Sequence, residues 1–76
     1  MKIEVKLHAQ LRKFAPQRSP ITLDVKEGTT IRQVIAKVGV PLKKAKLIIV
    51  NGLRGKPADK LSENTVLDLF PPLAGG

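Results

Sequence analysis

The chain has 76 residues, of which fourteen are lysine or arginine and six are aspartate or glutamate, so it carries a formal net charge of +8. Cysteine is absent, which excludes disulfides, thiolate metal sites and cysteine nucleophiles, and the length predicts one small domain without room for an enclosed active site. The sequence shows neither a charged leader with an apolar run nor a stretch long enough to span a bilayer, so we expect a cytoplasmic protein without membrane contact.

Apolar residues alternate with polar ones over 2–8 and again over 21–25, which predicts two half-buried strands. We expect these strands to form two edges of one sheet. His8, the only histidine, falls on the solvated face of the first strand, so we expect no catalytic or metal-binding role for it. Residues 9–20 are interpreted as a loop with one helical turn that plugs the end of the core.

A helix is predicted to begin at Thr30. Thr30 and Gln33 have the spacing of a capping box, in which each side chain bonds the other residue's backbone N–H group. From Ile31 onward, apolar residues recur at the i, i+3, i+4 and i+7 positions and form one stripe, which must be buried because so short a helix is marginal alone. Gly39 followed by Pro41 predicts the end of the helix.

The continuous apolar run at 47–50 predicts a central strand covered on both sides or along most of its length, and Asn51-Gly52 after it is a turn signal. Residues 53–64 are interpreted as a loop anchored by Leu61.

A last strand is predicted over 66–70, with Leu67 and Leu69 facing the core. Phe70 then falls on the other face. It is either an exposed docking anchor or a ring folded back over the sheet edge.

The final segment, 71–76, begins with two prolines, which cannot continue a central strand. Extended, it would reach at most about 20 Å, far enough to enter a cleft on another protein. Gly75 and Gly76 make its tip as thin as a polypeptide can be. We therefore expect a domain over 1–70 followed by an extended tail over 71–76 that presents a terminal carboxylate.

The order of elements predicts an α+β fold of the β-grasp type, in which a mixed sheet of four to five strands wraps one main helix. Two motifs add to this order: the turn at 50–52, and the tail at 70–76, which reads FPPLAGG. With them, the whole chain resembles the ubiquitin-like sulfur-carrier family of the MoaD and ThiS proteins. Within that family it is most similar to the small subunits of molybdopterin synthase.

This resemblance implies that the chain binds no cofactor itself. An adenylating enzyme that uses ATP and Mg would join Gly76 to AMP, and a sulfur donor such as a cysteine desulfurase system would then leave a thiocarboxylate. The sulfur would be used for molybdopterin synthesis in a pocket of the large catalytic subunit of the synthase. The residues implied to contact these partners are Phe70, Pro71, Pro72, Leu73, Ala74 and Gly75.

Other functions stay open. The same activated glycine could donate sulfur for thiazole or thiamine synthesis or for tRNA thiolation, or it could be joined to a lysine of a target protein. The positive charge makes an RNA-binding module a further alternative. Its phosphate contacts would come from Lys43, Lys44 and Lys46, which form one short basic tract. Against this class, the other basic residues are scattered through the sequence, and two phenylalanines are the only aromatic residues available for base stacking.

Overall fold

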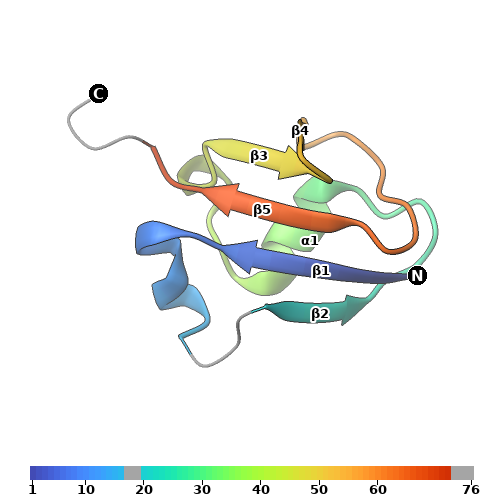
Figure 1. Ribbon diagram of the computed structural model, residues 1–76, viewed down its shortest axis with the longest axis horizontal. Coiled ribbons are helices and arrows are strands. Elements are labelled where there is room, and N and C mark those ends of the chain that lie inside the picture. The colour runs from blue at the N-terminus through green and yellow to red at the C-terminus, as the bar shows by residue number, and fades with distance from the viewer. Residues whose placement is uncertain (17–19, 73–76) are drawn as a thin grey trace.

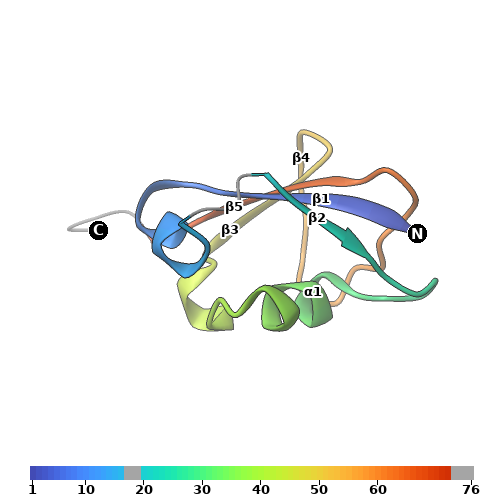
Figure 2. The same ribbon diagram turned by 90° about the horizontal axis from the view of Figure 1, so that it is seen from below.

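In the computed structural model of the protein, which describes residues 1–16 and 20–72, one main helix packs against one face of a five-stranded sheet (Figures 1 and 2). The predicted α+β architecture is therefore confirmed. The elements, in chain order, are β1 (Lys2–Leu7), the 3-10 helix η1 (Ala9–Phe14), β2 (Ile21–Asp24), α1 (Ile31–Val38), the 3-10 helix η2 (Leu42–Lys44), β3 (Leu47–Val50), β4 (Leu53–Arg54) and β5 (Val66–Phe70).

The strands lie in the order β2-β1-β5-β3-β4. β1 runs antiparallel to β2 and parallel to β5, with Glu4 opposite Val66. The expectation that the first two strands form two edges is correct for β2 and wrong for β1. The reason is that the last strand inserts between β1 and β3, so β1 lies in the interior of the sheet.

β3 is less covered than its apolar sequence predicts. Only Ile48 of its four residues is buried. Leu47 and Ile49 lie on the partly open face opposite α1, and Val50 lies beside the two-residue edge strand β4. Beyond β3, the edge of the sheet is the two-residue strand β4, which lies inside the predicted loop at 53–64. Asn51 and Gly52 form the connecting turn, and both have positive φ angles, of 49° and 85°, as a tight hairpin turn requires.

The core is formed by the inward-facing residues of the strands together with the apolar stripe of α1. Leu11 of η1 closes one end of it and is 2% exposed, and Leu61 anchors the long connection to β5, as predicted. The helix and strand residues with the least exposure are Ile3, Val5, Ile21, Ile31, Val34, Ile35, Leu67 and Leu69. Among the described residues, none of the helices is both long and apolar enough to cross a membrane.

α1 has the ends that the sequence predicts. The Thr30 hydroxyl oxygen accepts a hydrogen bond from the Gln33 N–H group at 3.3 Å, and the Gln33 side-chain oxygen accepts one from the Thr30 N–H group at 2.9 Å. At the other end, Gly39 has a φ of 94°, the left-handed conformation in which a glycine commonly ends a helix. These caps fix where α1 begins and ends.

Candidate functional site

The end of β5 is the place from which the predicted tail departs. We use "tail root" for Phe70, Pro71 and Pro72 together with the two side chains beside them, His8 and Asp68. Because β1 and β5 are parallel, both strands end on the same side of the sheet (Figure 1). Sequence positions near the two ends of the chain therefore meet at the tail root.

His8 connects β1 to β5 through three contacts. Its imidazole ring stacks on the Phe70 ring, with centroids 4.3 Å apart and an angle of 7° between the ring planes. Its Nε2 atom lies 2.8 Å from Oδ1 of Asp68, and its backbone N–H group donates to the Leu69 carbonyl oxygen at 3.1 Å. These contacts hold the Phe70 ring in one orientation at the start of the tail.

Sequence reasoning placed His8 on the solvated face and missed these contacts. The signal that could have found them is the strand pairing, since Leu7 lies opposite Leu69 in the parallel register and the next residues along, His8 and Phe70, therefore become neighbours. That register depends on which strands pair, and this cannot be read from either segment alone.

Phe70 is neither a fully exposed docking anchor nor a ring folded back over the sheet edge, the two alternatives that the sequence predicts. It is half-buried on the face of the sheet opposite α1, with one side of its ring covered by His8. Leu47 of β3 lies opposite it in the antiparallel register. The free part of the ring therefore belongs to the outer surface of the sheet, beside the tail.

Apolar residues lie on the outer surface near Phe70, on both sides of Asp68. Phe70 shares it with Leu47, Ile49 and Val66, all of which are half-buried, and we call these four residues the outer apolar strip. Figure 2 shows α1 on the opposite side of the sheet, with no helix of the described segments over this face. The strip is therefore available as an apolar contact surface that leads to the tail.

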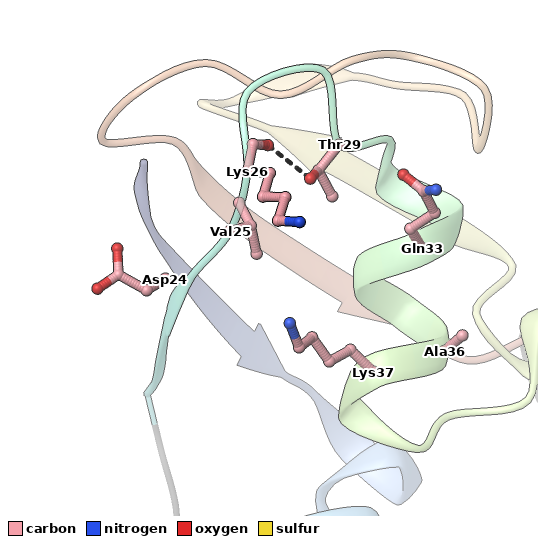
Figure 3. Close-up of a pocket in the computed structure, with 7 residues that line it drawn as sticks. All are labelled: Asp24, Val25, Lys26, Thr29, Gln33, Ala36 and Lys37. Carbon is pink, nitrogen blue, oxygen red and sulfur yellow. Dashed lines mark hydrogen bonds between the residues drawn. The ribbon is translucent and has the colours of Figure 1, made fainter.

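A pocket lies at the other end of the sheet. It has a volume of about 790 Å³ and lies between the segment after β2 and the exposed side of α1 (Figure 3). Lys26 and Lys37 line it, whereas the Asp24 side chain points away from it (Figure 3). Asp24 pairs with Lys2 at the start of β1, so this pocket is separated from the tail root by the length of that strand.

Four residues with predicted roles, Leu73, Ala74, Gly75 and Gly76, lie outside the described residues. Their roles, and the boundary between a domain over 1–70 and a tail over 71–76, stay predictions.

Comparisons with known proteins agree with the fold. A family model described as Mut7-C ubiquitin matches residues 1–72. No curated protein sequence matches the chain significantly.

Among solved structures, the H. volcanii small archaeal modifier protein 1 superposes with a TM-score of 0.77 at 21% identity, over 95% of this chain and 98% of that one. A putative molybdopterin converting factor, subunit 1, from Pyrococcus furiosus gives 0.75 at 23% identity, over 96% and 99%. The complex of subunits 1 and 2 of the molybdopterin-converting factor from Helicobacter pylori gives 0.62 at 18% identity, with both chains fully covered. These likenesses confirm the predicted ubiquitin-like β-grasp fold.

Proposed function

The chain belongs to the Mut7-C ubiquitin family, and on this premise we propose that it is a ubiquitin-like sulfur carrier that acts through the terminal carboxyl group of Gly76. The observation that carries the proposal is the tail root. There, β5 ends at two prolines beside an aromatic ring held in place by His8, and an open apolar strip leads up to it. Such an arrangement fixes the point from which a tail leaves the domain and places an apolar contact surface beside it.

The chemistry follows from the poor reactivity of a carboxylate. The Gly76 carboxylate attacks the α-phosphate of ATP on an adenylating enzyme, which releases pyrophosphate and forms an acyl adenylate. Hydrosulfide then attacks the carbonyl carbon, the bond to AMP breaks, and a thiocarboxylate remains. Where the donor is an enzyme persulfide, the same attack gives an acyl disulfide, and a second thiol of the partner attacks the sulfur on the enzyme side, which releases the thiocarboxylate and leaves a disulfide on the partner. ATP, Mg and the catalytic side chains belong to the partner, and the chain itself holds no cofactor. In a chain without cysteine, this carboxyl is the group suited to carry sulfur.

The outer apolar strip is the surface proposed to dock the partners. Its four members are each half-buried and lie on the outer face of β3 and β5, with Phe70 and Leu47 nearest the tail, which suits a contact surface more than a fully solvated face. The Helicobacter pylori complex supports a large catalytic subunit as one partner. The adenylating enzyme and a sulfur donor such as a cysteine desulfurase system are the others, and molybdopterin synthesis is the proposed destination of the sulfur.

Deleting Gly75 and Gly76 tests the tail. The protein is incubated with a cognate adenylating enzyme, ATP and a sulfide source, and its intact mass is measured. We expect the full chain to exchange one oxygen for sulfur at Gly76 and the truncated chain to stay unmodified with an unchanged fold, since a terminal arm contributes little burial. Sulfur incorporation by the truncated chain would contradict the proposal.

Phe70→Ala tests the docking surface. We expect it to weaken binding to the adenylating enzyme by more than about 1 kcal/mol, as the loss of an aromatic interface anchor often does. Leu53→Ala is the matched control, because Leu53 is 74% exposed on β4 and lies outside the outer apolar strip. Binding is measured by titration calorimetry. Equal affinity of the Phe70→Ala and Leu53→Ala proteins would show that Phe70 is not part of the interface.

A second candidate function is a protein modifier joined through Gly76 to lysines of targets. The likeness to the small archaeal modifier protein supports it. Mass spectrometry of the protein from its own cells separates the two functions, because a carrier yields a thiocarboxylate and a modifier yields conjugates linked through lysine. Thiazole synthesis and tRNA thiolation are alternative destinations of the same thiocarboxylate, and they are distinguished by the acceptor that is labelled.

A further inference from the structure

The positive charge of the chain is concentrated in its middle. No aspartate or glutamate occurs from 28 to 58, whereas this segment contains seven basic residues. They are Arg32, Lys37, Lys43, Lys44, Lys46, Arg54 and Lys56. All six acidic residues of the chain lie outside the segment, so most of the excess positive charge belongs to α1, η2, β4 and the residues that follow η2 and β4.

Four of these basic residues, separated in sequence, line one groove. Lys43 lies on η2 and Lys46 follows it, while Arg54 lies on β4 and Lys56 follows that strand. The groove has a volume of about 580 Å³, and all four side chains are exposed. We call it the basic groove. The folded chain therefore assembles from scattered residues a cluster of cations that the sequence shows only as one short tract.

The walls of the basic groove are held by backbone hydrogen bonds. The Gly55 N–H group donates to the Ile48 carbonyl oxygen at 2.9 Å, and the Arg32 N–H group donates to the Pro57 carbonyl oxygen at 2.8 Å. On the other side, Ala45 is buried and ties the end of η2 to the core. These contacts therefore fix the backbone of the two segments that carry the four cations.

None of the described residues that line the basic groove carries a carboxylate. The acidic residue nearest to the groove in sequence is Asp59, and its carboxylate accepts a hydrogen bond from the Lys56 N–H group at 2.8 Å. This hydrogen bond stabilises the segment that carries Lys56. The groove therefore combines four positive charges with one carboxylate behind them, and it attracts an anion with several charges.

We infer that the basic groove binds the phosphodiester backbone of a single-stranded nucleic acid. Lysines act as point charges that tolerate many positions of a phosphate, and an arginine can contact two phosphate oxygens at once, so the three lysines and one arginine of the groove suit a backbone of repeated phosphates. The groove has no aromatic side chain on which a base could stack. Binding is therefore independent of sequence, with a dissociation constant of about 10⁻⁴ to 10⁻⁶ M.

This function is separate from the proposed sulfur carrier. The groove lies on η2, β3 and β4 with the segment after them, and its lining includes no residue of the tail root. Either function can fail without the other.

The test is a titration of the full chain into fluorescein-labelled oligo(U) of about 12 nucleotides, followed by fluorescence anisotropy. If all four cations contact phosphates, the logarithm of the binding constant falls with the logarithm of salt concentration with a slope of about −2.8. Binding then weakens about 50-fold between about 50 and about 200 mM salt.

Two double variants with equal loss of charge locate the site. Lys46→Gln with Lys56→Gln removes half of the basic groove, and we expect the salt slope to become shallower by about 1.4. Lys26→Gln with Lys37→Gln removes the same charge from the pocket of Figure 3 and should leave the slope unchanged. Lys46→Arg with Lys56→Arg keeps the charge and should retain binding. Circular dichroism checks that each variant is folded.

Three results would overturn the inference. Equal weakening in both glutamine variants would mean that net charge, and not the groove, attracts the oligonucleotide. Absence of binding at about 50 mM salt would dismiss a nucleic-acid function, because non-specific contacts are strongest at low salt. Tighter binding of polyglutamate than of oligo(U), lost when Lys46 and Lys56 are replaced by glutamine, would assign the groove to an acidic protein.

Discussion

Replacing His8 and Phe70, separately and together, measures how strongly the stacked pair holds the tail root. Phe70→Ala removes a half-buried ring, which costs about 1 kcal/mol in burial, and it removes a stack worth about 0.5 to 1.5 kcal/mol. His8→Ala loses the same stack and also the contact with Asp68, a hydrogen bond worth about 0.5 to 1.5 kcal/mol. We therefore expect each variant to lower the free energy of unfolding by about 2 kcal/mol.

The quantity of interest is the coupling energy between the two residues. If the rings interact at 4.3 Å as described, the double variant loses about 0.5 to 1.5 kcal/mol less than the sum of the single variants. Urea unfolding followed by far-ultraviolet circular dichroism is the suitable assay, because the chain has no tryptophan or tyrosine to report by fluorescence.

His8→Phe is the matched control for this cycle. It keeps an aromatic ring over Phe70 and removes the bond to Asp68, so the coupling with Phe70 should persist while stability falls by the hydrogen-bond contribution alone. Single-variant losses that add within about 0.3 kcal/mol would refute the reasoning. Phe70 would then lie at the tail root without support from His8.

Two further predictions concern the scaffold of the molecule, and urea unfolding measures both. Thr30→Ala removes the hydroxyl that caps α1, so the free energy of unfolding should fall by about 1 kcal/mol; an unchanged midpoint would mean that water replaces this cap. Gly55→Ala should cost about 1 to 3 kcal/mol, because the added Cβ atom would lie 2.5 Å from Cγ2 of Val50 and 3.3 Å from Cδ1 of Ile31. Full stability of the Gly55→Ala protein would show that these side chains move aside.

The features that could be predicted from the sequence depend on short-range interactions. α1 begins and ends where its caps lie, since Thr30 and Gln33 bond within one turn and Gly39 supplies the left-handed residue. β5 ends at Phe70, where two prolines follow and cannot donate to a sheet. Leu61 was identified as an anchor because it is an apolar residue among polar ones.

The features that could not be predicted depend on which segments pair. The interior position of β1 and the contact of His8 with Phe70 both follow from the parallel pairing with β5, which neither strand encodes alone. β4 is only two residues long and gives no periodic signal. The basic groove was interpreted as scattered charge because Lys43 and Arg54 become neighbours only through the hairpin of β3 and β4.

The parallel pairing of β1 with β5 also has a consequence for the synthesis of the protein. β1 leaves the ribosome first and β5 is the last described strand to emerge, yet the two are neighbours in the middle of the sheet. Pairing at such sequence separation is slow to nucleate, and the core cannot close before β5 is available. A chain that ends before β5 lacks Leu67 and Leu69, two residues of the core, so the fold can form only after β5 has been made.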